Sequence, residues 1–556
     1  MGAVLAGLAD SAIGQMSASA AMASPVVPGE FLQDRPDGLL LGPGVHLVPR
    51  DTEIHADMVL LPGARIEVAN AATLSILGHF NAPVAPVFQG EGRVDLNAGR
   101  TPAAFPEWWG AQSNDSGADC RPAISACIQA HPLTMLQAAD YYLADTLVVD
   151  RPHRRVWGAG YRGTRSGEGT RLIVASGVVD VVRVGPAEKP SQVNDFIQGV
   201  DLRWMDLTRS QQLDGRANPQ PAGLRAQFLL FCQFEGISSS ESGSGFVATG
   251  VVRSYFRDCI AFRSFDATSS NAPWRGFLLD GNENIGLAGG NASIYLTDCN
   301  ASVGGEPNIS DGVGLLLSGA FSDSFIVNFE TTGVATGIRL DGQQNRIGGR
   351  AVAGHANVHI RMPIIDQCSA IGIEVRDTSE HALVELNEPY IGLAPKGQAG
   401  IVLNKTRGAV SISGGQILGG MNAQAKGNGI GLEASDSSGI MVHGFKLLDL
   451  QRPVVLERCC RCTLRCWINN PMHEASQAAV TVENCSRSVI DVLLGGKRGA
   501  FPAGISITGT SKNAALQIEA TGLDPDAMTE PPARVTIGNL RIPVPGRKRG
   551  VSVVGE

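Results

Sequence analysis

The sequence predicts an all-β chain built as a right-handed parallel β-helix, a solenoid in which short strands stack coil upon coil. Two observations lead to this prediction. A short apolar–x–apolar strand recurs along the second half of the chain, and small side chains recur at a fixed distance behind it. The composition agrees, because 68 of the 556 residues are Gly and only 5% are aromatic. Such a composition suits tight turns between closely stacked strands.

The recurring strand appears eight times between residues 313 and 510. Its copies begin at Val313, Ile338, Ile373, Ile401, Ile430, Val454, Val480 and Ile505. Alternation at period two buries one face of each strand, and a repeat of roughly 20–50 residues indicates a solenoid, a propeller or an array. The spacing of about 25 residues is too short for a four-stranded propeller blade. No leucine-rich frame or helical repeat is present, so coils of three short strands fit best.

Small side chains follow these strands at a constant offset of three residues. They are Thr406, Ser435, Cys459, Cys485 and Thr510. Parallel stacking favours similar neighbours one strand spacing apart, so we predict a ladder of small side chains at one corner of the coils. The preference of Thr and Ser for turns would explain the composition of this set but not its constant offset.

The pattern divides the chain into segments. We predict an N-terminal anchoring segment (1–30), an N-terminal β-rich domain (31–110), a capping helix with the first coil (111–150), the parallel β-helix (151–522) and a C-terminal cap (523–556). The helix should start near Asp119, which can cap it, with Pro122 in its first turn. It should cover the open end of the coils, since an uncapped end exposes core and unpaired strand edges.

Charge and composition argue against several classes of function. The net charge is −8 and the only basic run is at 547–549, so we do not expect nucleic-acid binding. No apolar stretch is long enough to insert into a membrane, and residues 1–24 lack the positive region of a signal peptide. The cysteine cluster at 459–466 lacks the paired C-x-x-C units of structural zinc, so we expect no metal and no cofactor.

Three stretches resemble the pectate-lyase-like β-helix proteins of phage tailspikes and related glycan-active enzymes: residues 72–111, 119–149 and 154–164. The resemblance implies a virion tail protein exposed to the host cell surface, with a secreted protein as the alternative. It further implies a homotrimer that binds a bacterial surface polysaccharide and contacts other tail or baseplate proteins through its N-terminus. The family's Asp-Asp-Thr before the helix is here Ala118-Asp119-Cys120.

The polygalacturonase motifs Asn-Thr-Asp, Gly-His-Gly and Arg-Ile-Lys are absent, which argues against pectin chemistry. Cleavage of a glycosidic bond needs an acid and a base or nucleophile, and the irregular coils around 278–313 should carry protruding loops, where function concentrates. The candidate catalytic residues there are Asp280, Glu283, Asp323 and Glu330, and the candidate sugar-stacking residues are Trp274 and Tyr255. Asp266 and Asp298 lie in the same region, although acidic residues at coil turns more often bond to the turn itself.

Two functions remain open from the sequence. The first is a tailspike or tail-fibre-like virion protein that binds a bacterial surface polysaccharide and depolymerises it, by glycoside hydrolysis or by β-elimination. The second is a non-enzymatic structural or receptor-binding virion protein on the same fold.

Overall fold

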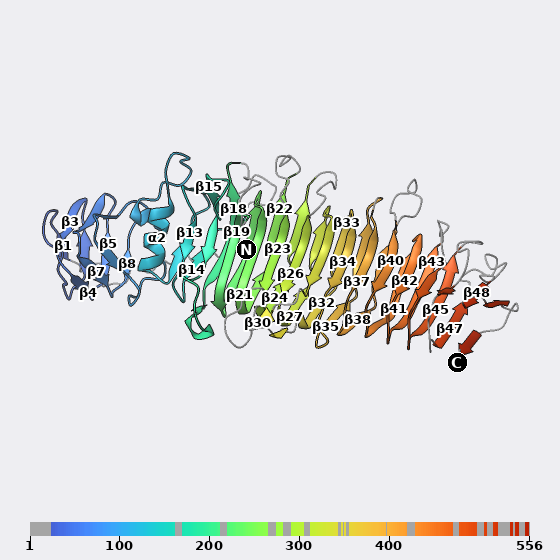
Figure 1. The fold of residues 1–556 in the computed structure, drawn as a ribbon. Coiled ribbons are helices and arrows are strands. Elements are labelled where there is room, and N and C mark those ends of the chain that lie inside the picture. The colour runs from blue at the N-terminus through green and yellow to red at the C-terminus, as the bar shows by residue number, and fades with distance from the viewer. Residues whose placement is uncertain are drawn as a thin grey trace. The chain divides into compact units, whose positions relative to one another are not determined.

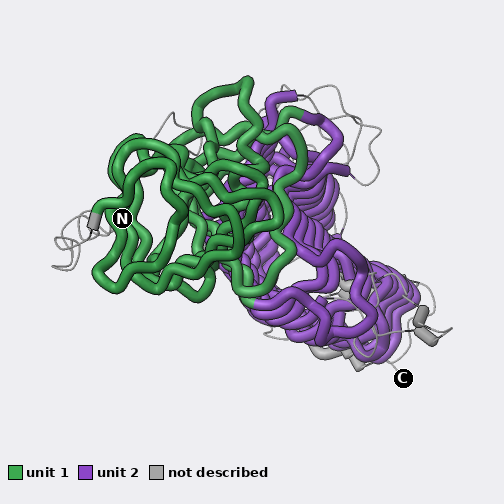
Figure 2. Tube along the Cα trace, turned by 90° about the vertical axis from the view of Figure 1, so that its left-hand side faces the viewer, with its two compact units in different colours: residues 1–175, 199–206 green, residues 176–198, 207–556 purple. Residues whose placement is uncertain are grey.

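The computed structural model describes residues 24–554, with gaps at 162–168, 212–219, 265–273, 282–290, 305–311, 343–345, 348–349, 352–354, 396, 420–428, 471–477, 497–504, 509–514, 521–533, 538–539 and 544–550. It divides into two compact units (Figure 2). Unit 1 holds residues 1–175 and 199–206, and unit 2 holds residues 176–198 and 207–556.

The front of unit 1 is itself made of parallel coils. One set of paired strands is β1 (Ser24–Val26), β2 (Leu39–Leu41), β5 (Met58–Leu60) and β8 (Phe80–Asn81); a second is β3 (Gly44–Val48), β6 (Ala64–Val68) and β9 (Phe88–Gln89); a third is β4 (Thr52–Ile54), β7 (Thr73–Ile76) and β10 (Arg93–Asp95). All these pairs are parallel. The chain passes through the three sets in turn, so the segment predicted only as β-rich already winds as a small β-helix.

The predicted helix is present in unit 1 as α2 (Arg121–Ala130), after the short 3₁₀ helix η2 (Pro106–Trp109). Ile124, Cys127 and Ile128 are buried, as their spacing predicts. The N-cap is Cys120, while the Asp119 carboxylate accepts a hydrogen bond from the Arg121 N–H at 3.0 Å. The strands that follow are β11 (Leu133–Met135), β12 (Asp140–Leu143), β13 (Leu147–Val149), β14 (Arg155–Trp157), β15 (Arg171–Val174) and β18 (Asp201–Arg209).

Unit 2 is a right-handed parallel β-helix whose strands form three stacks (Figure 1). In some coils one long strand, such as β41 (Ile440–Leu448), pairs in both the second and the third stack. The first stack holds β16 (Val182–Val184), β19 (Ala222–Leu230), β21 (Ser244–Arg257), β23 (Arg275–Gly281), β26 (Val313–Gly319), β29 (Thr336–Asp341), β34 (Ile371–Arg376), β37 (Ala399–Asn404), β40 (Ile430–Ser435), β42 (Arg452–Glu457), β44 (Val480–Glu483) and β46 (Ile505–Thr508). The long β21 continues beyond this stack into the second.

The other two stacks have the same parallel pairing. The second stack holds β17 (Ile197–Gln198), β20 (Gln233–Ser240), β24 (Asn291–Thr297), β27 (Phe321–Val327), β32 (Ala356–Arg361), β35 (Leu383–Asn387), β38 (Ala409–Ser413), β41 (Ile440–Leu448), β43 (Thr463–Asn470), β45 (Val489–Gly496) and β47 (Ala515–Ala520). The third holds β22 (Ile260–Arg263), β25 (Asn300–Val303), β28 (Glu330–Thr332), β33 (Ile364–Cys368), β36 (Tyr390–Leu393) and β39 (Gln416–Leu418).

Antiparallel pairs occur at two places in unit 2. β30 (Arg346–Ile347) pairs with β31 (Arg350–Ala351), and at the C-terminal end β48 (Arg534–Ile537) pairs with β49 (Leu540–Pro543) and β47 with β50 (Val551–Val554). A short 3₁₀ helix, η3 (Val193–Asp195), precedes β17. No helix among the described residues is long and apolar enough to cross a membrane.

The register of the first stack corrects the sequence alignment by two residues at two coils. Leu315 pairs with Ile338, and Ile401 pairs with Leu432, which pairs with Val454. The sequence alignment had placed Val313 opposite Ile338 and Ile430 opposite Ile401 and Val454. These pairings were wrong by two residues, although the strands themselves were paired correctly. The reason is that alternation at period two fixes which face is buried but permits register shifts in steps of two.

The corner ladder exists, with one member corrected. The Thr406 N–H donates to Ser437 Oγ at 3.0 Å, and the Cys459 N–H donates to Cys485 Sγ at 3.3 Å. Ser437 takes the place of the predicted Ser435. Because the observed register of this coil differs by two residues from the predicted one, the residue opposite Thr406 also shifts by two. Thr510 lies outside the described residues.

Candidate functional site

The structure does not bring the predicted catalytic carboxylates together. Asp280 lies in β23 of the first stack, Asp323 in β27 of the second, and Glu330 at the start of β28 in the third. The three stacks are separate faces of each coil, so these carboxylates cannot flank one glycosidic bond within this chain. Glu283 and Asp266 lie outside the described residues.

Two of the acidic candidates accept a hydrogen bond from an asparagine of the next coil. Asp323 has φ 50° and its carboxylate accepts a hydrogen bond from Asn357 Nδ2 at 2.7 Å. Asp298 has φ 54° and accepts one from Asn328 Nδ2 at 2.9 Å. Asp and Asn tolerate this left-handed backbone better than other side chains, so both carboxylates support local backbone geometry by bonding to the next coil, Asp323 within β27 and Asp298 just after β24.

The two aromatic candidates have different surroundings. The Trp274 side chain is 1% exposed, so the expectation that it stacks on a sugar is corrected: its ring belongs to the core. Tyr255 is 44% exposed and begins a row of stacked rings along the second stack. The ring centroids of Tyr255 and Tyr295 are 4.6 Å apart, those of Tyr295 and Phe325 are 5.7 Å apart, and those of Phe325 and His359 are 4.6 Å apart. Because these rings cover one another's faces, they present mainly their edges to a ligand.

A polar column runs along the outward face of the first stack. Thr249, Asp280, Ser318, Asp341 and Arg376 occupy matching positions on five successive coils. A parallel strand spacing of about 4.8 Å places Asp280 and Asp341 about 10 Å apart along the column, with Ser318 between them. The structure therefore gives the predicted residue Asp280 a carboxylate partner that the sequence analysis did not identify.

A second column lies beside the first and completes a charged network. Its residues Arg339 and Glu374 are in register and form an ion pair. Arg376 Nη2 lies 2.5 Å from Asp341 Oδ2, while its Nη1 lies 3.7 Å from Glu374 Oε1. The Asp341 and Glu374 side chains are only 9% and 11% exposed. Hydrogen bonding to Asp341 raises the pKa of the Arg376 guanidinium.

A signal for this network is present in the sequence. Arg339-Leu340-Asp341 stands opposite Glu374-Val375-Arg376 on the next coil, so outward positions of opposite charge alternate across the two strands. Opposite charges directly across neighbouring strands are favourable. The repeat alignment already placed Ile338 opposite Ile373, so the signal was present in it, and a shift of two residues would instead place Asp341 opposite Glu374, two like charges.

The residues of this face can do two things. Carboxylates and guanidinium groups are strong hydrogen-bond acceptors and donors for sugar hydroxyls, and two carboxyl groups about 6.5–9.5 Å apart are the arrangement of inverting glycosidases. The same ion pairs also hold neighbouring coils together. Among the described residues no group of three or more His, Cys, Asp and Glu side chains is arranged to hold a metal ion.

No protein-family model matches this chain, and no curated protein matches it by sequence. Among solved structures, it is similar to the tailspike protein of E. coli bacteriophage HK620 in complex with a pentasaccharide, at 11% identity and a TM-score of 0.54, over 74% of this chain and 78% of that chain. A mutant of the same tailspike protein in complex with a hexasaccharide gives 12% identity and a TM-score of 0.54 over the same shares. The Azotobacter vinelandii mannuronan C-5 epimerase AlgE6 A-module gives 12% identity and a TM-score of 0.45, over 76% of this chain and 99% of that chain. At these identities, the tailspike likeness shows a shared parallel β-helix fold.

Proposed function

We propose that this protein binds a bacterial surface polysaccharide along the outward face of the first stack. The observation that carries the proposal is the in-register polar column of Asp280, Ser318, Asp341 and Arg376. Support comes from the fold, since the similar tailspike structures hold oligosaccharides. A chain of sugars repeats along its length, and a face whose polar groups repeat about every 4.8 Å offers matching contacts to several units.

The proposal includes cleavage of that polysaccharide. Asp280 and Asp341 are the proposed acid and base of an inverting hydrolysis: two strand spacings of about 4.8 Å separate their backbones, close to the upper end of the carboxyl separations that leave room for a water molecule. One carboxyl protonates the leaving oxygen while the other takes a proton from the attacking water. Arg376 and Arg339 position the carboxylates beside them and donate hydrogen bonds to sugar oxygens.

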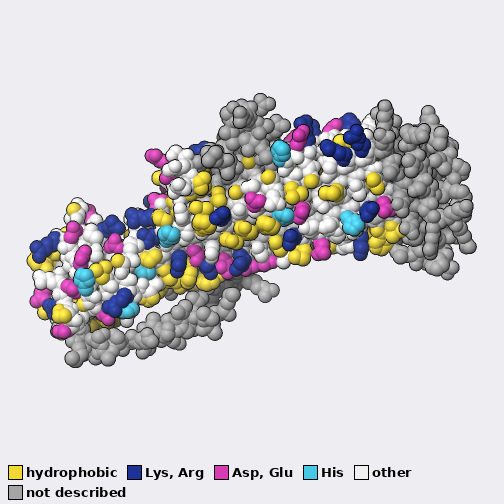
Figure 3. Space-filling view, turned by 90° about the horizontal axis from the view of Figure 1, so that it is seen from below, with side chains coloured by type: hydrophobic (Ala, Val, Ile, Leu, Met, Phe, Trp, Pro, Cys, Tyr) yellow, Lys and Arg dark blue, Asp and Glu magenta, His cyan; other side chains and the backbone are white. Residues whose placement is uncertain are grey.

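We further propose that the protein acts as a virion tailspike and as a homotrimer, with its N-terminus on other tail or baseplate proteins. A trimer is supported by exposed apolar side chains in one column of the second stack. These include Tyr255, Met441 and Val489, which are 44%, 47% and 38% exposed. Figure 3 shows hydrophobic side chains gathered between charged ones on one face of the protein. Polar residues such as Glu385 and Ser411 lie between Tyr255 and Met441 in this column, so the apolar side chains would meet a sister chain at separate points along the stack.

The test is incubation of the full chain with purified surface polysaccharide from candidate host bacteria. New reducing ends with no ultraviolet-absorbing product would support hydrolysis, whereas unsaturated products would indicate β-elimination. Binding without either product would favour the second candidate function, a receptor-binding protein without enzymatic activity. Absence of binding to every host polysaccharide, together with an unaltered glycan, would reject the proposal.

A further inference from the structure

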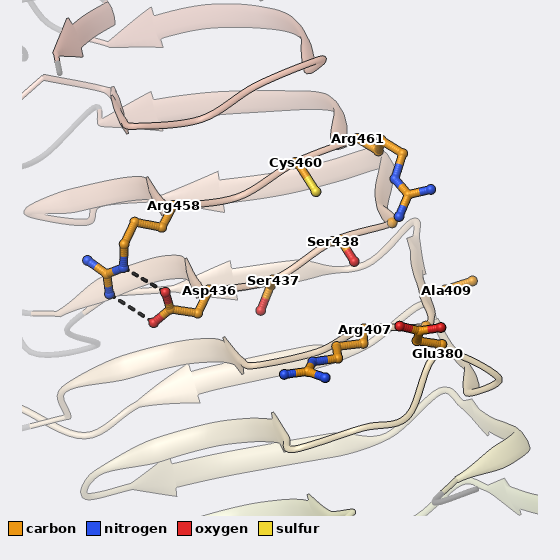
Figure 4. Close-up of a pocket in the computed structure, with 11 residues that line it drawn as sticks. Glu380, Arg407, Ala409, Asp436, Ser437, Ser438, Arg458, Cys460 and Arg461 are labelled. Atoms are coloured by element: carbon orange, nitrogen blue, oxygen red, sulfur yellow. Dashed lines mark hydrogen bonds and ion pairs between the residues drawn. The ribbon is translucent and has the colours of Figure 1, made fainter. Parts of the chain in front are cut away.

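A pocket of about 730 Å³ lies at the corner where the first stack turns into the second (Figure 4). It extends over the turns after β37, β40 and β42 and reaches the loop before β35. The lining residues used below are Glu380, Arg407, Asp436, Ser438, Arg458 and Arg461. It lies apart from the polar column of the proposed polysaccharide face, since it occupies the turn rather than the strands.

Two glycines of the pocket lining pack directly against the backbone of the preceding coil. A Cβ on Gly408 would lie 2.2 Å from the Ala382 carbonyl oxygen, so no larger residue fits there without movement of the backbone. Gly439 has φ 73°, and a Cβ on it would lie 2.7 Å from the Gly408 carbonyl oxygen. The coil geometry therefore requires glycine at the same corner position on two neighbouring coils.

Two arginines stand on either side of this hollow. Arg407 follows β37, while Arg461 follows β42 two coils further on, so their backbones are about 10 Å apart along the stack at a strand spacing of about 4.8 Å. Ser438 lies on the coil between them and forms an isolated parallel β-bridge with Cys460. Figure 4 shows the Arg407 and Arg461 side chains on opposite sides of Ser438.

The three arginines that line the pocket differ in their partners. Arg458 is held by Asp436 through Nε at 2.6 Å and Nη2 at 2.9 Å, and its Nη1 also pairs with the Glu457 carboxylate. In the part of the chain that the structure describes, Arg407 and Arg461 have no ion-pair partner. These two guanidinium groups are therefore the ones that can bind an anionic ligand in a pocket that is also lined by the Glu380 carboxylate.

We propose that this pocket binds an acidic sugar residue through its oxyanion, a carboxylate, phosphate or sulfate. The planar guanidinium fork matches carboxylate and phosphate oxygens, and the Ser438 hydroxyl supplies a further donor. A bare ion would fill little of the volume, whereas pockets of about 300–1,000 Å³ suit small organic ligands. The sugar part rests on the proposed polysaccharide binding, and it makes the polysaccharide an acidic one that contacts the protein at two places.

The experiment measures binding to the full chain by calorimetry at low salt, with glucuronate, glucose 6-phosphate, glucose and inorganic phosphate as probes. We expect both acidic sugars to bind and glucose not to bind. Arg407→Gln and Arg461→Gln should each weaken binding at least tenfold. Arg487→Gln is the matched control, because Arg487 is an exposed arginine at the equivalent corner position of the next coil and does not line the pocket.

Several outcomes would overturn the inference. Equal binding of glucose and glucuronate would remove the role of the oxyanion, and equal binding of inorganic phosphate and glucose 6-phosphate would remove the role of the sugar. Unchanged affinity in both pocket variants, with melting temperatures like that of the native chain, would place the ligand elsewhere. None of these results would affect polysaccharide binding that depends on Asp341. Failure of the acidic-sugar pocket can therefore be distinguished from failure of the proposed function.

Discussion

Asp341 and Arg376 stand in register on neighbouring coils, with Oδ2 of the carboxylate 2.5 Å from Nη2 of the guanidinium. The same guanidinium lies within 3.7 Å of Glu374, so one cation holds two nearly buried carboxylates. The pair therefore has two separable effects: it fastens two coils, and it fixes the position of a carboxylate on the proposed polysaccharide face.

Asp341→Asn should separate these effects. The amide keeps the size of the carboxylate but cannot act as a base, and loss of a general acid or base costs about 10²–10⁴-fold in rate. We expect release of reducing ends to fall by that factor. The free energy of unfolding should fall by only about 1–3 kcal/mol, the usual cost of leaving a buried partner unsatisfied, because Arg376 retains Glu374.

The matched control for this variant is Glu433→Gln. Glu433 belongs to the same outward column as Glu374, two coils further along, but lies outside the network. The Glu433→Gln variant should release reducing ends at the native rate. Its free energy of unfolding should stay within about 0.5 kcal/mol of that of the native chain, as is usual for surface substitutions. Full activity of the Asp341→Asn variant would remove this residue from the mechanism.

A second prediction concerns acid stability. Burial lowers the pKa of His355 to about 4, against 6.5 for an exposed histidine. The neutral ring stacks on Phe321 at 5.8 Å and lies 3.4 Å from the Leu317 carbonyl oxygen. Because the unfolded chain takes up this proton first, stability is unaffected above about pH 6.5. It falls as the pH drops from 6.5 to 4, by up to about 3 kcal/mol at 1.36 kcal/mol per unit.

His355→Phe keeps a ring against Phe321 but removes the titrating group. Urea unfolding at pH 7, 6, 5 and 4 should therefore show a shallower loss of stability in this variant than in the native chain. His443→Phe is the control, since His443 is exposed. Identical slopes for the native chain and the His355→Phe variant would contradict the assignment.

The sequence predicted the positions of the strands better than the register in which they pair. Alternation at period two identified the buried face of each coil, yet Ile430 was aligned where Leu432 belongs, because both satisfy that pattern. The charged network at Asp341 was missed although Ile338 and Ile373 were aligned correctly, because the alignment was used only for the buried positions and not for the outward charges. Trp274 was predicted to stack on a sugar because it lies in the region of irregular coil spacing, whereas its 1% exposure comes from packing that no local pattern records.

The N-terminal coils show a different limit. Strands such as β4 and β8 hold two or three residues, too few for alternation to define a repeat. Their parallel pairing depends on residues about 20 positions away, as in the pairing of Met58 with Leu39. Composition and turn residues therefore predicted β structure in this segment without predicting coils.

A third prediction concerns the ring row on the second stack. Tyr295 stacks between Tyr255 and Phe325, and each such pair contributes about 0.5–1.5 kcal/mol beyond area burial. Tyr295→Ala should therefore destabilise the chain by about 1–3 kcal/mol more than Tyr390→Ala, by summing two pairs. Tyr390 is a half-buried tyrosine of the third stack that has no ring partner among the described residues.

Both tyrosine variants should bind polysaccharide as the native chain does, because the ring faces of the row are covered by one another. Equal stability of the two variants would show that the row adds nothing beyond buried area. Loss of polysaccharide binding in the Tyr295→Ala variant would instead move the proposed binding face to the second stack.

The last prediction tests the corner ladder. Cys485 Sγ accepts the Cys459 N–H at 3.3 Å, just as Ser437 Oγ accepts the Thr406 N–H at 3.0 Å on earlier coils. If the position needs an acceptor, Cys485→Ser should be tolerated, whereas Cys485→Ala should cost about 1–3 kcal/mol more because it leaves a buried N–H unpaired. Ser437→Cys and Ser437→Ala form the reciprocal pair and should show the same difference in urea unfolding. If Ala and Ser proved equally stable at residue 485, and Ala and Cys at residue 437, the ladder would reflect only the turn preference of small residues. The constant offset would then have no energetic cause, so these four variants decide between hydrogen bonding and turn preference at this corner.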